Sequence, residues 1–280
     1  MQDVVSLFKN LDIDKLSRRK MIMIVKRLTK KCRIRLKRRF GQHFLVDPGA
    51  IRRIIEHIRG SEKVLEIGPG IGLLTYLLSQ VCGLVIGIEI DRSFINILNM
   101  ICKLRNNIDI VITDALLFKI PNDLKVFSNL PFYITSDIIV KFVREGVKEA
   151  LITVQREVAN RLTAVPGSPD YGRLSVLVQC FYNVRKLFNI GRLSFYPPPE
   201  VDASVVLLER RSNPCISMNV LHIFEKVTSL LFSFRNKNVE KVLKNYLNVQ
   251  VPDNLRGKRV FELSVDDVVS IVELVAGCIE

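Results

Sequence analysis

Five short, nearly continuous apolar segments alternate with amphipathic ones between residues 63 and 155, and this alternation restricts the possible folds more than any other feature. Strands that are apolar on both faces lie inside a parallel sheet with helices on either side. The pattern therefore predicts an α/β fold with a doubly wound, mostly parallel sheet. The expected strands are residues 64–67, 84–90, 108–113, 126–129 and 150–155, and the expected helices are residues 73–80, 93–104 and 135–145.

Two further apolar runs extend the expected sheet to seven strands, and helical spacing dominates the C-terminal part of the chain. These runs are residues 187–190 and 203–208, after a helix expected over residues 172–182. Upstream, Asp47 and Pro48 mark the start of another helix. Beyond Arg211 the strand pattern ends, and residues 218–280 are typical of three to five short helices. We expect a basic N-terminal extension at residues 1–39, a sheet domain at residues 40–211 and a small all-helical domain at residues 212–280.

The net charge of +14 is concentrated near the N-terminus. Residues 15–39 contain 13 lysines and arginines and no acidic residue, which leaves +1 for the remainder of the chain. This density favours contact with the phosphates of a nucleic acid, although an anionic membrane surface or a solvated basic tail is compatible with the same pattern. Helical spacing is visible around residues 21–28.

The sequence carries no sign of a membrane segment or a metal site. The longest uncharged apolar stretch near the N-terminus, residues 21–25, is too short for a secretion signal or a spanning helix. We therefore expect a cytoplasmic protein that does not enter a membrane. The six cysteines form no Cys-x-x-Cys pair and have no histidine at ligand spacing, so we expect reduced thiols in or near the core and no bound metal.

A glycine turn, Gly68-Pro69-Gly70-Ile71-Gly72, lies where the first strand enters the first helix. Glycines at this point let the backbone approach a ligand, and the start of the helix presents free N–H donors. A dinucleotide site requires Gly-x-Gly-x-x-Gly. Here the third glycine comes one residue early and Leu73 takes its place, which argues against a nicotinamide cofactor.

Two acidic residues stand at the ends of consecutive strands of the predicted sheet. Glu89 lies about 20 residues after the glycine turn, where a carboxylate can accept both ribose hydroxyls, and Asp114 can accept from an adenine amino group. Each acid alone is more often a solvated strand end, but together they indicate an adenosine at the sheet edge. Because no phosphate-binding lysine stands beside the turn, S-adenosylmethionine fits this site.

The segment Asn129-Leu130-Pro131-Phe132 ends the fourth strand, beside the expected cofactor. The Asn129 side-chain oxygen and the Leu130 carbonyl can each accept one N–H of an adenine amino group, which aims the nitrogen lone pair at the reacting carbon. Pro131 stiffens the turn, and the Phe132 ring can stack on the extracted base. A turn that is merely packed by its aromatic ring is the alternative.

With these residues in view, the sequence resembles the ribosomal RNA small-subunit adenine dimethyltransferases from residue 38 to about residue 210, and in type over its C-terminal helices. The matching segments are Phe40-Gly41-Gln42-His43-Phe44-Leu45, Glu66-Ile67-Gly68-Pro69-Gly70, Glu89-Ile90-Asp91, Asp114-Ala115, Asn129-Leu130-Pro131-Phe132, Gln155-Arg156-Glu157-Val158-Ala159, Tyr171-Gly172-Arg173-Leu174-Ser175-Val176 and Phe195-Tyr196-Pro197-Pro198-Pro199-Glu200-Val201-Asp202. The glycine motif alone is shared by many methyltransferases, whereas the combination is highly specific.

The resemblance implies a Rossmann-like methyltransferase fold and dimethylation at N6 of two adjacent adenines near the 3′ end of small-subunit rRNA. It implies a monomer that acts on the pre-small-subunit ribosomal particle, with rRNA bound by the helical domain. His43 and Leu45 would line the methionine part of S-adenosylmethionine, and Phe195 would be the second ring against the target adenine. The implied neighbours of the rest of the cofactor are Gly68, Gly70, Glu89, Asp114 and Asn129.

The sequence departs from the family at three points. Phe132 stands where relatives often have tyrosine, which keeps stacking but removes a hydroxyl, and Tyr133 stands where small or polar residues are common. The basic extension is longer than the family minimum, so its role is not inherited. Two rivals remain: an antibiotic-resistance methylase acting on one large-subunit adenine, and a ribosome-assembly binding factor whose enzymatic site has decayed.

Overall fold

The computed structural model describes residues 2–9, 11–36 and 41–277, and the chain forms two compact units. The first comprises Met1–Ile138, Val147–Arg156 and Leu187–Leu207, and the second comprises Ile139–Gly146, Glu157–Lys186 and Leu208–Glu280. Among the described residues, no helix is long and apolar enough to cross a membrane. The division into residues 1–39, 40–211 and 212–280 stays a prediction.

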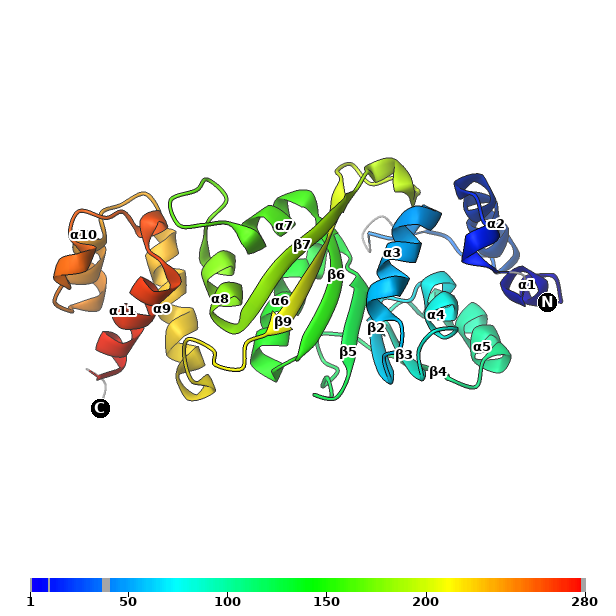
Figure 1. The fold of residues 1–280 in the computed structure, drawn as a ribbon, viewed down its shortest axis with the longest axis horizontal. Coiled ribbons are helices and arrows are strands. Elements are labelled where there is room, and N and C mark those ends of the chain that lie inside the picture. Colours follow the sequence, from blue (N-terminus) through cyan, green and yellow to red (C-terminus); the bar gives the residue numbers. More distant parts are fainter. Residues whose placement is uncertain (1, 10, 37–40, 278–280) are drawn as a thin grey trace. The chain divides into compact units, whose positions relative to one another are not determined.

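A seven-stranded sheet runs through the chain in the order β4-β3-β2-β5-β6-β9-β7 (Figure 1). The strands are β2 (Lys63–Ile67), β3 (Leu84–Glu89), β4 (Ile108–Ile112), β5 (Lys125–Asn129), β6 (Glu149–Gln155), β7 (Tyr182–Ile190) and β9 (Ala203–Arg210). The pairs β2–β3, β3–β4, β2–β5 and β5–β6 are parallel. This confirms the predicted mostly parallel, seven-stranded sheet.

The register of the parallel strands brings their carboxyl ends to one edge. Ile67, the last residue of β2, lies beside Ile88 of β3 and Ser128 of β5. The next residues along each strand are Gly68, Glu89 and Asn129, so three predicted site residues come from adjacent strand ends. In open α/β sheets, ligands bind outside this edge.

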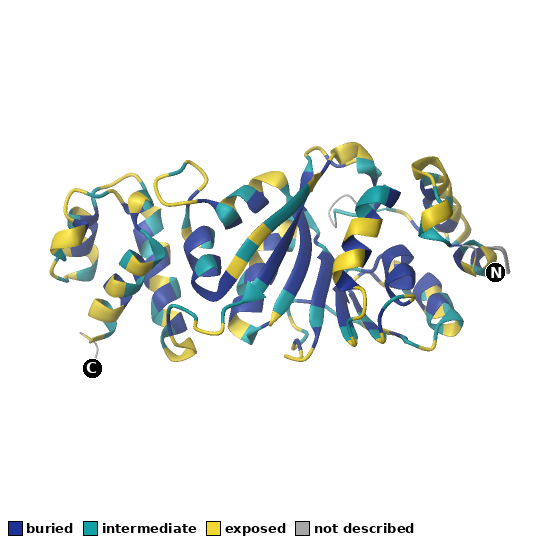
Figure 2. Cartoon of the chain, in the orientation of Figure 1, coloured by how far each residue is buried: buried dark blue, intermediate teal, exposed yellow. Residues whose placement is uncertain are grey.

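The helices that alternate with the strands begin and end close to the predicted bounds, with α7 as an additional helix. They are α3 (Pro48–Ile58), α4 (Leu73–Leu78), α5 (Ile95–Leu104), α6 (Thr135–Glu145), α7 (Arg156–Thr163) and α8 (Arg173–Phe181). The Asp47 carboxylate caps α3 by accepting from the Ala50 N–H at 3.0 Å, and Pro48 is the first helical residue, as expected. Strands β2, β5, β6 and β9 are mostly buried, whereas β4 and β7, at the two ends of the sheet, also carry half-buried and exposed residues (Figure 2).

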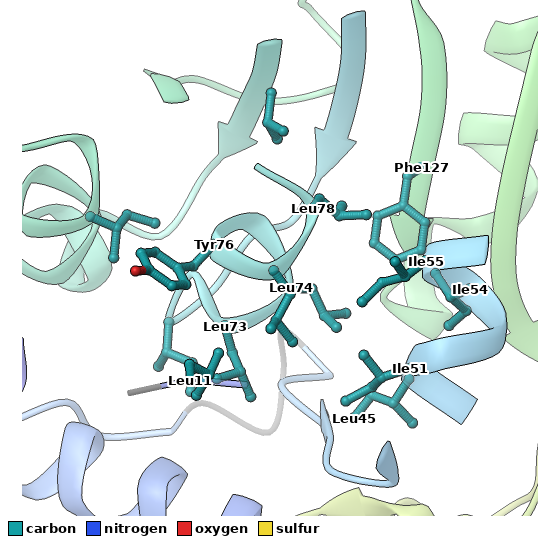
Figure 3. Close-up of a cluster of buried hydrophobic side chains, with 14 of the residues drawn as sticks. Leu11, Leu45, Ile51, Ile54, Ile55, Leu73, Leu74, Tyr76, Leu78 and Phe127 are labelled. Carbon is teal, nitrogen blue, oxygen red and sulfur yellow. The ribbon is translucent and has the colours of Figure 1, made fainter. Parts of the chain in front are cut away.

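The N-terminal extension is folded rather than a solvated tail. It forms α1 (Gln2–Lys9) and α2 (Arg18–Lys31), and α1 packs against both α2 and α5. The apolar face of α2, made of Met21, Val25 and Leu28, is fully buried. Leu11, between the two helices, joins the core cluster that also holds Leu73 and Tyr76 (Figure 3). The last basic residues of the run, 37–39, lie outside the described residues.

Four elements differ from the expectations. Strand β7 begins at Tyr182 rather than at residue 187, and α7 was not expected because its apolar face, Val158, Ala159 and Leu162, covers only two turns. The two-residue strands β1 (Phe44–Leu45) and β8 (Phe195–Tyr196) form an antiparallel pair about 150 residues apart in sequence, which periodicity does not reveal.

The C-terminal part of the second unit is helical, as predicted. It contains α9 (Leu221–Ser233), α10 (Val239–Val242), a π-helical turn at Leu243–Leu247 and α11 (Val265–Gly277). Phe224 of α9 meets Phe181 of α8 edge to face, with ring centroids 6.4 Å apart. Both rings are fully buried, so this contact contributes to the core of the second unit.

Candidate active site

A cavity of about 230 Å³ opens at the carboxyl ends of the parallel strands of the first unit. It brings together most of the residues that the sequence singled out. Those lining it are His43, Leu45, Gly68, Gly70, Glu89, Asp114, Asn129 and Pro131. We call this space the cofactor cavity, and the placement agrees with the prediction that consecutive strand ends build one ligand site.

The glycine turn has the backbone conformation that glycine favours. Gly68, Gly70 and Gly72 have φ values of 78°, 56° and 73°. A Cβ on Gly72 would lie 2.4 Å from Cδ1 of Ile101, so this glycine allows α4 and α5 to pack closely. A Cβ on Gly68 would meet nothing within 4 Å, which leaves this part of the turn open to a ligand.

Glu89 organises the turn through both of its carboxylate oxygens. Oε2 accepts from the Gly70 N–H and Oε1 from the Asp91 N–H, each at 2.8 Å. Burial raises the pKa of Glu89, while these backbone bonds oppose that shift. Each oxygen has a second lone pair, so the carboxylate can still accept from a diol.

Asp114 lies where β4 has ended and lines the cofactor cavity next to Thr113 and Ala115. Its Oδ1 accepts from the Leu116 N–H at 2.9 Å, which holds the carboxylate in a short turn. The β4 end is fixed to its neighbour by the Thr113 N–H, which donates to the Glu89 carbonyl at 2.9 Å. The two acids therefore share one wall of the cavity.

Glu66 is a site residue outside the set that the sequence predicts. It lies within β2, is only 2% exposed and lines the cofactor cavity. Its Oε2 is buried without a hydrogen-bond partner among the described residues. Burial raises the pKa of Glu66 to about 7, the nearby Thr75 hydroxyl opposes this shift, and the negative charge of Glu89 adds to it. The available signal was a glutamate in an otherwise apolar strand directly before the glycine turn.

The Asn129 side chain is held by a hydrogen bond to the main chain of the segment that precedes α3. Its Nδ2 donates to the His43 carbonyl at 3.0 Å, which leaves Oδ1 as the acceptor of the amide. The Leu130 N–H donates to the Thr153 carbonyl at 3.1 Å, and the Leu130 side chain is buried. No hydrogen bond to the Leu130 carbonyl is found among the described residues. Two acceptor oxygens are thus available at the end of β5.

A second cavity, of about 520 Å³, adjoins the first. Its walls include Leu36, Phe132, Gln155 and residues 197–201, and we call it the acceptor cavity. Four residues line both cavities: Gly41, Gln42, His43 and Tyr133. The centroids of the Phe132 and His43 rings are 6.2 Å apart, with 29° between the ring planes. A flat ligand in the acceptor cavity would therefore meet an aromatic wall beside the cofactor cavity.

Hydrogen bonds tie the segment before α3 to the proline turn. His43 Nδ1 donates to the Pro197 carbonyl at 2.7 Å. The Val46 N–H donates to the Ser194 carbonyl at 2.8 Å, and the Ser194 hydroxyl donates to the Asp47 carboxylate at 3.0 Å. These bonds hold two remote segments together as one wall of the acceptor cavity.

Phe195 is the predicted site residue that the structure does not bring to the others. Its side chain is 2% exposed, belongs to the core cluster and lines neither cavity. Pairing of β8 with β1 places Phe195 opposite Leu45, and both side chains are buried in that core. A stacking role for Phe195 stays a prediction, and Phe40 lies outside the described residues.

Tyr133 and Gln42 were not among the predicted site residues, although Tyr133 was noted as a departure. The Tyr133 side chain is 51% exposed between the two cavities, and its pKa is raised by partial burial and by the charges of Asp114 and Glu89. Gln42 Nε2 donates to the Asp91 carboxylate at 2.8 Å. Within the described ranges, no group of three or more His, Cys, Asp or Glu side chains is arranged to hold a metal ion.

The site suits S-adenosylmethionine. The unpartnered Oε2 of Glu66 matches an ammonium group, Glu89 matches a ribose diol, and the open glycine turn leaves room for the ligand backbone. A site for adenosine without phosphates, on a seven-stranded, mostly parallel sheet of this order, defines the class of S-adenosylmethionine-dependent methyltransferases.

Comparison with known proteins narrows this class. The sequence model of the family described as ribosomal RNA adenine dimethylase matches residues 33–276. The chain is 37% identical over 251 residues to the probable ribosomal RNA small subunit methyltransferase A of Thermococcus sibiricus, covering 83% of this chain and 89% of that protein. It is 36% identical over 247 residues to the ribosomal RNA small subunit methyltransferase A of Thermotoga petrophila, covering 87% and 93%.

Two solved structures are similar over most of their length. A dimethyladenosine transferase from Plasmodium falciparum superposes with a TM-score of 0.72 and 28% identity, covering 82% of this chain and 96% of that one. The 23S rRNA methyltransferase ErmE superposes with a TM-score of 0.64 and 26% identity, covering 83% and 99%. This chain belongs to the ribosomal RNA adenine dimethylase family, and it is an rRNA adenine dimethyltransferase.

Proposed function

We propose that the protein dimethylates N6 of two adjacent adenines near the 3′ end of small-subunit rRNA, using S-adenosylmethionine. The observation that carries this proposal is that the two cavities share His43, whose carbonyl fixes the amide orientation of Asn129 in the cofactor cavity. When bound, S-adenosylmethionine supplies an electrophilic methyl group. The chain supplies orientation, because an adenine amino group is a poor nucleophile until its lone pair is aimed.

In the cofactor cavity, buried acids and the glycine turn bind the ligand. Glu89 accepts the ribose hydroxyls and Asp114 accepts from the adenine amino group. Glu66 binds the ammonium group, for which its buried Oε2 offers an acceptor that no described residue uses. Gly68 and Gly70 allow the ligand to approach the backbone, while His43 and Leu45 line the methionine part.

In the acceptor cavity, polar oxygens and one ring orient the target base. Asn129 Oδ1 and the Leu130 carbonyl accept the two N–H groups of the adenine, which favours a pyramidal nitrogen directed at the cofactor cavity. Phe132 stacks on the base, and Pro131 keeps the turn stiff. Phe195 would become a second stacking ring only if its side chain left the core in the complex.

The relatives' names favour the small subunit over the large one. Both relatives named above carry a small-subunit name, whereas the structure named for 23S rRNA has the lower TM-score. We further propose that the protein acts as a cytoplasmic monomer on a pre-small-subunit particle. Residues 212–280 would contribute to rRNA binding, supported by exposed cations such as Lys237, Lys241 and Lys244.

The test is incubation of the protein with labelled S-adenosylmethionine and, separately, immature small subunits and large-subunit rRNA. We expect N6,N6-dimethyladenosine only in the small-subunit rRNA, at two neighbouring positions mapped by primer extension. Label in a single adenine of large-subunit rRNA would overturn the substrate assignment in favour of the resistance-type reaction. Failure to bind the cofactor in calorimetry would favour a binding factor without enzymatic activity.

A further inference from the structure

The basic helix α2 has a fixed position in the first unit. Ser17 caps its start by accepting from the Lys20 N–H at 3.3 Å, and the buried stripe of Met21, Val25 and Leu28 anchors it to the core. Every cation of the helix is exposed, namely Arg18, Arg19, Lys20, Lys26, Arg27, Lys30 and Lys31. The core therefore holds a dense row of positive charges at the protein surface.

This row lies next to the wall of the acceptor cavity. Lys26 Nζ is 5.3 Å from the centre of the Tyr196 ring, and the Arg18 guanidinium donates to the Leu193 carbonyl. Tyr196 directly precedes Pro197, which lines the acceptor cavity, and Leu36 beyond the helix lines it too. The helix thus contacts the strand that leads into the cavity wall.

Four cations of α2 have no acidic partner among the described residues. In the part of the chain that the structure describes, Arg19, Lys20, Arg27 and Lys30 form no ion pair. The acids nearest in sequence are engaged elsewhere, since Asp12 pairs with Lys15 and Asp14 with Arg52. Clustered cations without protein partners favour a polyanion as ligand.

The burial of the apolar face distinguishes between the two polyanions that a basic helix can bind. A helix that lies on a membrane inserts its apolar face among the lipids. In α2 that face is 0% exposed at Met21, Val25 and Leu28, so it is unavailable for insertion. An RNA backbone requires only the charges, which all remain accessible.

We propose that α2 is an RNA-binding element whose cations contact the phosphates flanking the target adenines as the base enters the acceptor cavity. This inference rests on the proposed function, because it assigns a partner surface to the same site. Arg19, Lys26 and Lys30 are separated by seven and four residues, spacings that place them on one face of the helix. Since Lys26 meets Tyr196, this face is the one toward the acceptor cavity.

Deleting the extension is not a suitable test. Val4, Phe8 and Leu11 are buried together with the α2 stripe, so removal of residues 1–37 would expose the core of the first unit. Neutralising substitutions in the full chain avoid this problem. The double variant Arg19→Gln/Lys30→Gln removes two exposed cations of the proposed face, and neither side chain has an interaction within the described protein.

The matched control is Arg59→Gln/Lys148→Gln. Both residues are exposed and belong to the first unit, but they precede β2 and β6 and so lie at the amino edge of the sheet, opposite the cavities. Binding of each protein to a transcript of the 3′ end of small-subunit rRNA is measured against salt concentration. Thermal unfolding and cofactor affinity are measured in parallel as checks of folding.

We expect the α2 variant to bind the transcript about tenfold more weakly at 0.15 M salt, with a log–log salt slope smaller by about 1.4. The control should stay near wild type, and both should bind cofactor normally. Unchanged affinity and slope in the α2 variant, or equal losses in both variants, would overturn the proposal. So would a loss of binding to phosphatidylserine vesicles with RNA binding intact.

The RNA-binding measurement can fail or succeed independently of the proposed methylation. RNA binding and its salt slope are measured without turnover, so they report on α2 even if no adenine is methylated. Conversely, methylation at the wrong rRNA would overturn the substrate assignment while leaving the measured α2 contribution to phosphate binding in place.

Discussion

The two adjoining cavities are built in different ways. The cofactor cavity is formed largely by residues at the carboxyl ends of strands β2, β3, β4 and β5 or just after them, each positioned by its strand. The acceptor cavity combines Leu36, residues 41–43, Phe132, Gln155 and residues 197–201, which come from distant parts of the sequence. The first therefore depends on local strand–turn chemistry, and the second on long-range hydrogen bonds such as that from His43 to Pro197.

Because the two cavities differ in this way, one should bind the cofactor and the other should orient the target base. The cofactor cavity contains buried carboxylates, so its variants should act on ligand affinity and on pH dependence. The acceptor cavity is lined by aromatic rings such as Phe132 and adjoins the neutral acceptor of Asn129, so variants here should act on the rate of transfer. Asn129 belongs to the boundary, because its side chain lines the cofactor cavity while its neighbour Phe132 lines the acceptor cavity.

The largest effect is expected for Asn129→Ala. Loss of the side-chain acceptor removes orientation of the amino group, and kcat should fall about 10³-fold, in the range seen for oriented hydrogen-bond groups. Dissociation constants for cofactor and RNA should change by less than about threefold, since neither depends mainly on this amide. Single-turnover methylation and calorimetry provide these values. A near wild-type rate would show that Asn129 does not orient the base.

Glu66→Gln tests the buried acid of the cofactor cavity through pH. The folded pKa of Glu66 is about 7, against 4.5 for the ordinary group. Between these values an unfolded chain loses the proton that the folded chain keeps, so the free energy of unfolding of the cofactor-free protein falls by about 3 kcal/mol as pH rises. The variant should lose most of this decline in urea titrations at pH 4.5 and pH 8.

The same glutamate should couple cofactor binding to proton release. A bound ammonium favours the carboxylate, so binding near pH 6 should release a proton in the wild-type protein and not in Glu66→Gln. Calorimetry in buffers of different ionisation enthalpy measures this release. Glu56→Gln, at an exposed glutamate of α3, is the control and should behave as wild type. Equal proton release from wild type and Glu66→Gln would remove Glu66 from the ammonium site.

Glu89→Gln should weaken cofactor binding by about 30-fold, or about 2 kcal/mol. The substitution replaces one carboxylate oxygen by an NH2 group, which cannot accept a hydrogen bond from a ribose hydroxyl. At saturating cofactor, kcat should change by less than about threefold, since Glu89 does not contact the acceptor base. Steady-state kinetics over cofactor concentration separates the two quantities. A fall in kcat with KM unchanged would contradict a binding role.

Tyr133→Asn should have the smallest effect. This half-exposed side chain lines both cavities, so replacing it widens their junction. We expect changes of about two- to fivefold in KM for cofactor and RNA, corresponding to partial loss of one aromatic contact. The Phe132→Tyr variant is a suitable companion, since it keeps the stacking ring and should retain activity. A hundredfold loss in Tyr133→Asn would assign this phenol a direct part in transfer.

The sequence predicted the cofactor cavity better than the acceptor cavity, for a physical reason. Strand periodicity locates strand ends, and parallel strands bring those ends together, so Gly68, Glu89, Asp114 and Asn129 were expected in one place. Glu66 escaped notice because periodicity does not reveal that a strand carboxylate lacks a partner. The predicted carbonyl acceptor at Leu130 depends on a turn, and its geometry was not available from the pattern.

Long-range pairing accounts for the remaining differences. The burial of Phe195 follows from pairing between β1 and β8, and two-residue strands have no recognisable period. The packing of α1 and α2 depends on a narrow stripe, Met21, Val25 and Leu28, within a strongly basic segment. The prediction for that segment depends on its many cations, whereas the structure shows the apolar stripe that anchors it to the core.

A crystal structure of the protein with sinefungin, whose amine stands in for the transferable methyl group, tests the central claim most directly. We expect the ribose hydroxyls within about 3 Å of Glu89, and the inhibitor's amine at the junction of the two cavities, within about 4 Å of Asn129 Oδ1. An inhibitor bound outside the cofactor cavity, or one whose amine is separated from Asn129 by other side chains, would contradict it.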